Sequence, residues 1–396
     1  MFARREVTHA SQTARLDVTR PYPDPAMIRV AILSTLLLAG ASSLHAQKKG
    51  DSPLLKVGLE DPYTGKDPKA MAKLGVLGYG PLAWADHKRT TDIEKVLGEG
   101  RVLWMETEHF KIGCNLGFVG GPKESVARRL MKSELKRLNK KCSKIPASKS
   151  KLGPWLRMHL YALRAEDMYA EFAELTGKND KGMHLGNKEK FLLLLFQKKS
   201  DLARYMTTFG NRKSEQSQRV QHYGTGHFSV VMTAEGDDGP RDNETVNAQF
   251  RFFMAQMFLD SVGGAPMWLS RGLAHRFERE IPCRMINCGI KANESVDSST
   301  QYEWAKKILK RSKHDGLCLP FVKLANETDL GYYGSVQAWS VTDYMIQDRA
   351  KFTQFLQLVL GKYSRSRQIQ ALEAAYGKDP ETFDLEWRKW VKKNYK

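Results

Sequence analysis

Long apolar runs are scarce in this 396-residue chain, and their scarcity limits how it can meet a membrane. Beyond a short apolar segment near the start, no stretch holds the roughly eighteen uninterrupted apolar residues that a membrane-spanning helix needs. The sequence therefore predicts no transmembrane helix in the mature chain. With 41% hydrophobic residues, the chain can still bury a full core, in one large domain or two modest ones.

Cysteine is scarce too, with five residues in the whole chain: Cys114, Cys142, Cys283, Cys288 and Cys318. An exported location would permit disulfides, but the odd number leaves at least one thiol free or paired between chains. Cys283 and Cys288 are the nearest pair in sequence, although spacing does not define the connectivity. In a chain of this length, the core should supply most of the stability.

Familiar catalytic signatures are missing as well. There is no Gly-x-Ser-x-Gly elbow, and the glycine-containing stretch 113–121 lacks the Lys-Ser/Thr ending of a phosphate-binding loop. No spacing of Ser, His and Asp singles out a triad. Several scattered residues could instead form a metal site of another kind, although such irregular spacing is usually incidental. They are His222, His227, His275, Cys283 and Cys288.

Acidic residues are outnumbered, with 44 Asp and Glu against 63 Lys and Arg. The densest basic run, residues 128–151, holds ten Lys and Arg and only one acid, Glu134. The spacing predicts a helix with cations on one side and apolar residues on the other. The cations are Arg128, Arg129, Lys132, Lys136 and Lys140; the apolar residues are Val126, Leu130, Leu135 and Leu138. A solvated helix face explains this run most simply, and contact with a polyanion is the alternative.

Residues 27–46 have the features of a secretory signal peptide. Arg29 precedes about eleven mostly apolar residues, and small residues follow them. We expect cleavage after Ala46, with Ser43 as the alternative, and a secreted or periplasmic protein. A buried N-terminal strand or helix is the other interpretation of this segment. Residues 1–26 carry no apolar periodicity and are interpreted as an upstream extension that precedes the native start.

The expected mature chain, residues 47–396, is strongly basic. It holds 58 Lys and Arg against 41 Asp and Glu, a net charge of +17. Such a charge favours polyanions, anionic lipid head groups or acidic cell-wall polymers, without specifying one of them.

The hydrophobic pattern predicts an α+β fold, with a small mixed sheet first and a mostly helical half second. Residues 47–100, rich in Gly, Pro, Lys and Asp, indicate an extended lead-in arm. An α+β domain is expected over 101–280 and a helical subdomain over 281–396. Strands are predicted at 101–112 and 191–196, with a hairpin at 220–233. Helices are predicted at 122–141, 154–176, 197–210, 243–260, 266–280, 299–311, 334–348, 351–361, 366–376 and 380–393.

The most informative stretch is the helix pair 243–260 and 266–280. Its second helix reads Pro-Met-Trp-Leu-Ser-Arg-Gly-Leu-Ala from Pro266 to Ala274. Here the chain resembles the gluzincin zinc metallopeptidases, in particular the exported bacterial "peptidase MA-like" families. Those families follow an edge strand with a His-Glu-x-x-His helix and a second helix reading Pro-x-Trp-Leu-x-Glu-Gly-Leu-Ala. Looser matches extend the resemblance from residues 106–110 to the helix at 333–340 and to Glu386 and Trp387.

The resemblance implies a zincin-like fold and places the metal ligands of the family at specific positions. The first ligand falls at Asn247, the second at Arg251 and the third at Arg271, while the general base falls at Ala248. Arginine offers donors but no lone pair and repels a divalent cation, and alanine cannot take a proton from water. We therefore expect no catalytic residues, no metal and no cofactor at this site.

Two guanidinium groups facing a dry cleft need counter-charges. Glu244 and Glu278 are within helical reach and could supply them, with Trp268 as further support for the site, or the partner could be a bound anion. The sequence thus predicts an exported, inactive metallopeptidase-like protein with a binding or structural role in the cell envelope. Its partner would be an anionic peptide or a cell-envelope polymer. The alternatives are a hydrolase with other catalytic residues, for instance around the three histidines named above, and a polyanion-binding protein using residues 128–151.

Overall fold

The fold is that of a computed structural model, which describes residues 58–85, 87–178, 183–210, 218–223, 227–236, 239–281, 285–287, 295–297, 303–314 and 316–396. Side chains are not described for 218–223, 285–287 and 295–297. The predicted upstream extension and signal peptide, residues 1–46, lie outside these ranges, and so do Cys283 and Cys288.

A five-stranded mixed sheet forms the centre of the N-terminal half, in the order β3-β4-β7-β9-β8. Its strands are β3 (Leu103–Glu106), β4 (Phe110–Cys114), β7 (Phe191–Phe196), β8 (Gln218–Tyr223) and β9 (His227–Thr233). The central strands β4, β7 and β9 run parallel, whereas β3 and β8 are antiparallel to their neighbours at the two edges. All six residues of β7 are buried, as the uninterrupted apolar run 191–196 predicted.

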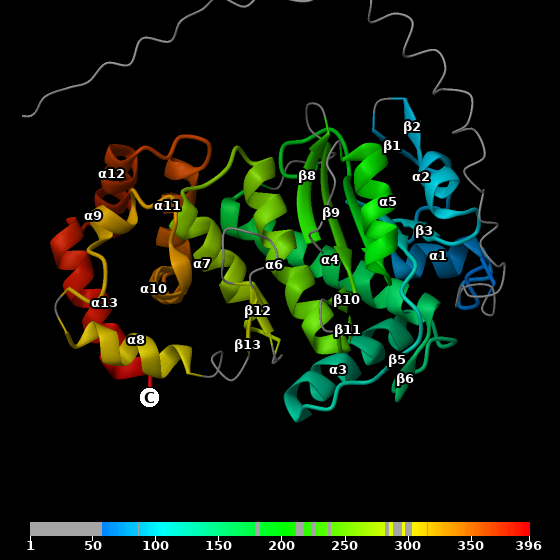
Figure 1. The fold of residues 1–396 in the computed structure, drawn as a ribbon, viewed down its shortest axis with the longest axis horizontal. Helices are drawn as coiled ribbons and strands as arrows, with labels where there is room; N and C mark the ends of the chain where they lie inside the picture. Colours follow the sequence, from blue (N-terminus) through cyan, green and yellow to red (C-terminus); the bar gives the residue numbers. More distant parts are fainter. Residues whose placement is uncertain are drawn as a thin grey trace, which may run out of the picture. The chain divides into compact units, whose positions relative to one another are not determined.

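Helices cover both faces of this sheet (Figure 1). The helices α2 (Thr90–Leu97) and α5 (Lys199–Phe209) pack on one face, against the side chains of Leu192 and Leu194. The long helices α4 (Pro154–Thr176) and α6 (Asn243–Ser261) contribute to the core on the other face, together with Leu193 and Leu195. Alternate residues of β7 therefore face two helical layers. The prediction of a small mixed sheet followed by a mostly helical half is confirmed.

The first predicted strand, residues 101–112, is wrong in its extent. The chain forms the antiparallel hairpin β3–β4, in which Met105 is paired with Ile112. The turn is closed by the Thr107 amide, which donates to the Phe110 carbonyl (2.8 Å). A carboxylate from α4 holds this turn, since Glu166 accepts from the Thr107 hydroxyl (2.6 Å) and from His109 Nδ1 (2.6 Å). Sequence alternation alone does not reveal a turn that is stabilised from a distant helix.

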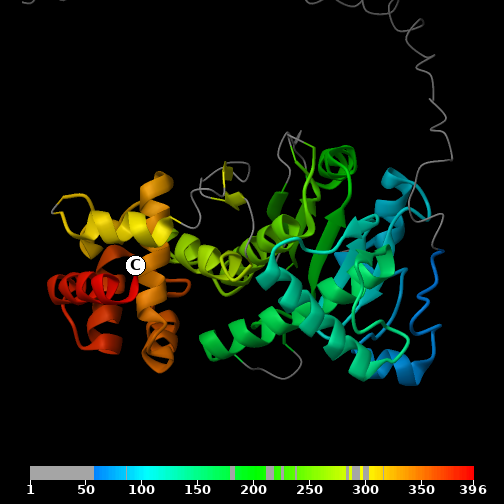
Figure 2. The same cartoon turned by 90° about the horizontal axis from the view of Figure 1, so that it is seen from below.

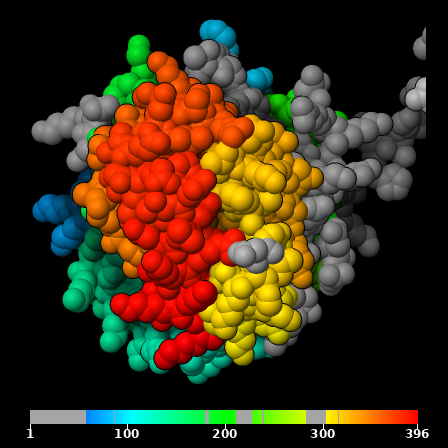
Figure 3. Space-filling model, turned by 90° about the vertical axis from the view of Figure 1, so that its left-hand side faces the viewer, coloured from blue at the N-terminus to red at the C-terminus, as the bar shows by residue number. Residues whose placement is uncertain are grey.

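The C-terminal half is built from helices, as predicted. They are α7 (Met267–Glu278), α8 (Trp304–Ser312), α9 (Phe321–Leu324), α10 (Gly331–Met345), α11 (Arg349–Val359), α12 (Arg365–Tyr376) and α13 (Pro380–Asn394). Among the described residues of this half, the elements not expected were the short α9 and the small hairpin of β12 (Met285–Asn287) and β13 (Ser295–Asp297). Figure 2 shows α8 to α13 gathered together, and Figure 3 shows α13 (red) beside α8 and α9 (yellow), which it contacts.

Residues 58–100 differ from the extended lead-in arm that their composition indicated. They contain α1 (Pro68–Leu74), β1 (Ala83–Ala85), β2 (Lys88–Arg89) and α2. Asp61 is only 1% exposed and bonds to His159 of α4, which ties this segment to the body of the protein. The small strand pairs β5 (Val119–Gly120) with β6 (Lys151–Leu152), and β10 (Glu235–Gly236) with β11 (Gly239–Pro240), complete the fold.

The basic helix α3 (Ser125–Lys141) forms as predicted, but its buried side is partly different. Ala127, Met131, Leu135 and Leu138 face the core, whereas Val126 and Leu130 are each 38% exposed. Residues 127, 131, 135 and 138 follow the i, i+4 spacing more closely than the predicted set, so they define the packed stripe. Among the helices that the structure describes, none is long and apolar enough to cross a membrane.

Candidate functional site

The helices α6 and α7, which carry the predicted degenerate site, pack against each other. Asp242 begins α6 as its N-cap, accepting from the Thr245 amide (2.7 Å). Trp268 anchors α7 from the other side, because its buried indole Nε1 donates to Gln368 Oε1 on α12 (2.7 Å). Trp268 is therefore a core residue that joins two helices.

Asn247 and Ala248, the predicted positions of the first ligand and the general base, are closed off from solvent. Asn247 is 4% exposed and Ala248 is 0% exposed, and Ile281 packs on Ala248. The Oδ1 atom of Asn247 has no hydrogen-bond partner among the residues that the structure describes. It lies at a cavity of about 10 Å³, which Ile281 and Arg164 also line. A cavity of this size has room for about one water molecule.

Arg251, at the predicted second ligand position, is held in an ion pair that the sequence did not suggest. Its Nη1 atom lies 2.6 Å from Glu280 Oε2, and Arg276 Nη1 lies 3.1 Å from the other oxygen of the same carboxylate. Burial raises the pKa of Glu280, and the two arginines oppose that shift. The counter-charge of Arg251 is thus Glu280, which follows the end of α7.

The two acids that the sequence proposed as counter-charges make other contacts as well. Glu244, which is 7% exposed, accepts from the Lys123 amide (2.9 Å) and so joins α6 to the segment before α3. The fully buried Glu278 accepts from His275 Nδ1 (2.8 Å). Their spacing along the predicted helices placed both acids near the site. Glu280 lies beyond the end of α7, so helical periodicity could not identify it.

Arg271, at the predicted third ligand position, is 6% exposed, and its guanidinium lies over the Phe252 ring, 5.7 Å from the ring centroid. Burial lowers the pKa of the adjacent His275 well below its usual value, and the charges of Arg271 and Arg279 add to this effect. Burial and the two arginines therefore favour the neutral form of the His275 imidazole.

These residues do not fit a zinc ion. Arg251 is occupied by a carboxylate, Ala248 has no donor atom, and Asn247 supplies a single neutral oxygen. Among the described residues, there is no group of three His, Cys, Asp or Glu side chains placed to hold a metal. The alternative metal site at His222, Cys283 and Cys288 falls on side chains outside the described part of the chain, so it stays a prediction.

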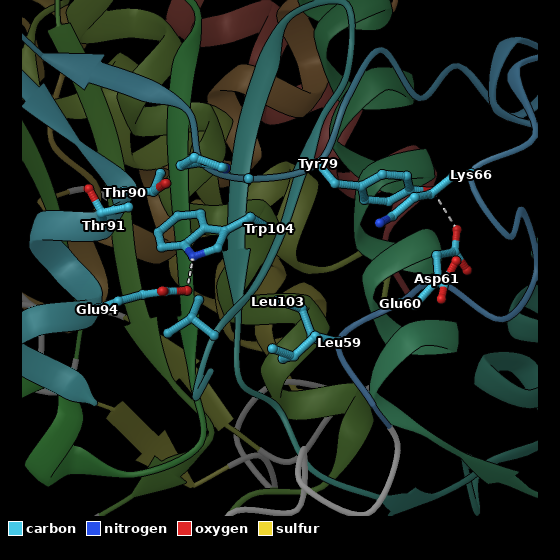
Figure 4. A pocket seen from close by; sticks show the side chains of 13 residues that line it. Leu59, Glu60, Asp61, Lys66, Tyr79, Thr90, Thr91, Glu94, Leu103 and Trp104 are labelled. Carbon is cyan, nitrogen blue, oxygen red and sulfur yellow. Dashed lines mark hydrogen bonds between the residues drawn. The ribbon is translucent and has the colours of Figure 1, made fainter. Parts of the chain in front are cut away.

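A larger cavity, of about 400 Å³, lies at a place that the sequence did not single out (Figure 4). Its walls come from the segment 59–66, the segment 79–81, the helix α2 and the strand β3. The polar side chains that line it are Glu60, Asp61, Lys66, Tyr79, Thr90, Thr91, Glu94 and Trp104. Four separate segments contribute these residues at no regular spacing, so sequence reasoning had no motif by which to find them.

Comparison with known proteins yields no relative for this chain. No family model matches it, and neither a curated protein nor a solved structure matches it. Inferences about function therefore depend on the residues and their geometry.

Proposed function

We propose that this protein is a catalytically inactive, exported relative of the gluzincin metallopeptidases, with a binding or structural role in the cell envelope. One observation carries the inactivity: Ala248 is fully buried beneath Ile281 at the position of the general base. The residue at the second metal-ligand position supports the same proposal, because this residue, Arg251, forms an ion pair with Glu280.

Peptide hydrolysis on this scaffold would require three things at one place. A Lewis acid must polarise the carbonyl, a base must activate water, and the peptide must reach both. Fixed guanidinium groups disfavour a divalent cation, and alanine cannot act as a base. A cavity of about 10 Å³ beside Asn247 does not admit a peptide bond.

Binding of an anionic peptide or an envelope polymer between Arg251 and Arg271 remains part of this proposal. Glu280 already neutralises Arg251, so an anion at that point would have to displace this carboxylate. Arg271 is only 6% exposed, so a large anion would also require α6 and α7 to move apart.

The inactivity can be tested with the purified full-length protein, casein and a mixture of unstructured peptides. We expect no hydrolysis that a chelator abolishes, because the site lacks a base and three metal ligands. Chelator-sensitive cleavage that is lost in an R251A/R271A variant would overturn the proposal.

A rebuilt site provides a test of the register. The variant N247H/A248E/R251H/R271E restores every ligand type of the family pattern, and we expect it to bind about one zinc ion per chain. The matched control N247H/R251H retains Arg271 and lacks the third ligand, so it should bind zinc much more weakly. Zinc titration, with circular dichroism as a check on folding, distinguishes the two. Equal zinc binding by a folded rebuilt variant and by its control would contradict the assignment of Arg271.

A second candidate function, binding to a polyanion, is favoured by the exposed cations of α3 and the loop that follows it. All ten Lys and Arg side chains of residues 128–151 are exposed. Among these ten cations, Arg137 alone has an ion pair within the described part of the chain, with Asp167 (2.6 Å). The one acid of the run, Glu134, points inward to Arg164 (2.7 Å) and does not offset the surface charge.

Reversing three of these charges should weaken heparin binding markedly. We expect the variant K132E/K136E/K140E to elute from heparin at a clearly lower salt concentration than the wild-type protein, because polyanion affinity falls with each lost contact. The matched control K389E/K392E/K393E changes the net charge equally on three exposed lysines of α13. Equal shifts for the two variants would show that net charge alone is responsible and would exclude a specific face.

A further inference from the structure

The cavity of about 400 Å³ beside α2 has the size of a small-molecule site and a pre-formed wall. Asp61 holds that wall together, because its Oδ2 atom accepts from Tyr79 (2.6 Å), Thr64 (2.9 Å) and His159 (2.9 Å). Its Oδ1 atom accepts from the Tyr63 amide (2.9 Å). Both oxygens are therefore used inside the protein, and Asp61 acts on the cavity by fixing its shape.

The opposite wall presents a carboxylate that is held in place. Trp104 Nε1 donates to Glu94 Oε1 (2.8 Å), as Figure 4 shows. The indole is closely packed against two glycines. A Cβ atom on Gly80 would approach the Trp104 side chain to 2.9 Å, and one on Gly113 would approach it to 2.5 Å. Glu94 is thus oriented by a clamped tryptophan, with Oε2 free of any side-chain partner that the structure shows.

The charge of Glu94 is not balanced by the described residues. Burial raises the pKa of this carboxyl, and so does the nearby Glu99, whereas hydrogen bonds from the Trp104 indole and the Gly100 backbone lower it. No salt bridge to Glu94 is present among the described residues, and Lys66 lies at the far wall of the cavity (Figure 4). A half-buried carboxylate without a counter-charge is costly, and a cation that enters the cavity would offset that cost.

The rest of the lining distinguishes an organic cation from a metal ion. Part of the cavity wall is apolar and is formed by Leu59, Val102 and Leu103. Thr91, on the same helix as Glu94, adds a hydroxyl to the lining. A metal ion would need several converging oxygen ligands and far less space. A volume of about 400 Å³ instead suits a molecule with an apolar body and one charged end.

We propose that this cavity binds a small organic amine, whose ammonium group pairs with the Glu94 carboxylate while its apolar stem lies on Val102 and Leu103. The site is separate from the degenerate helix pair, so it does not depend on the peptidase resemblance. Glu94 supplies the charge recognition, and the Trp104 hydrogen bond orients it. Asp61 and its three side-chain donors keep the opposite wall in place.

The test compares butylamine with 1-butanol, which has the same stem and no charge, on the full-length protein by calorimetric titration or ligand-observed NMR. We expect butylamine to bind at least tenfold more tightly than the alcohol. The E94Q variant should lose at least tenfold in amine affinity and change little towards the alcohol, since glutamine keeps an acceptor for Trp104.

The matched control is D92N, which removes one negative charge from the exposed side of the same helix, where Asp92 pairs with Lys95 (2.9 Å). This variant should bind butylamine like the wild-type protein. Equal binding of the amine and the alcohol, absence of amine binding at millimolar concentration, or a folded E94Q variant with wild-type affinity would each overturn the proposal.

Discussion

Replacing Gly272 by alanine should lower the free energy of unfolding by about 3 kcal/mol, at the upper end of overpacking effects. A Cβ atom at this position would lie 2.2 Å from Thr342 Oγ1 and 2.4 Å from the carbonyl oxygen of Ala338. The second of these atoms belongs to the backbone of α10, so no side-chain rotation relieves the clash. The helices α7 and α10 would have to separate, and both belong to the main core. Urea denaturation of the G272A variant measures the effect.

Two further variants make this prediction specific. Gly120 has open space where its Cβ would lie, so G120A should change the unfolding free energy by no more than about 0.5 kcal/mol. The double variant G272A/T342A removes the hydroxyl contact but leaves the Ala338 carbonyl, so it should recover only part of the loss. A G272A variant as stable as the wild-type protein would show that α7 and α10 do not approach this closely.

Gly272 also illustrates what sequence can predict. Its place in the Pro-x-Trp-Leu pattern singled it out, and the close approach of α10 gives that residue a physical reason. The helices α4 and α6 and the strand β7 were likewise predicted, because apolar periodicity and uninterrupted burial are local properties. Such patterns report how a segment faces the core, and they are enough to establish an α+β arrangement.

Long-range contacts explain most of the differences. Glu280 pairs with Arg251 across 29 positions, and Glu166 holds the β3–β4 turn from 59 positions away. The lead-in segment forms helices against a distant layer, although its composition is typical of an extended chain. The cavity of about 400 Å³ needs Asp61, Glu94 and Trp104 together, and no spacing in the sequence connects them. Composition and periodicity contain no information about which segments meet in space.

Removing the Asp61 carboxylate should have the second large effect, because it leaves several buried donors without an acceptor. The D61A variant should lose about 3 kcal/mol of unfolding free energy, since His159, Tyr79 and Thr64 all donate to one oxygen of Asp61. The D67N variant is the control, because an asparagine can still cap the exposed start of α1. Equal stability of D61A and D67N would contradict a structural role for Asp61.

The hydrogen bonds to Asp61 should also make the protein less stable at acidic pH. Burial alone would raise the pKa of Asp61, but the donors, His159 foremost, outweigh burial and lower the pKa from 3.8 to about 2. A depressed pKa stabilises the folded state above pH 3.8, and this contribution is lost as the pH falls towards 2. Asparagine has no carboxyl group to titrate, so the difference in unfolding free energy between the wild-type protein and D61N should shrink by up to about 2 kcal/mol over that interval. Urea denaturation at successive pH values measures the difference, and a gap that stays constant down to pH 2.5 would show that Asp61 titrates as it does in the unfolded chain.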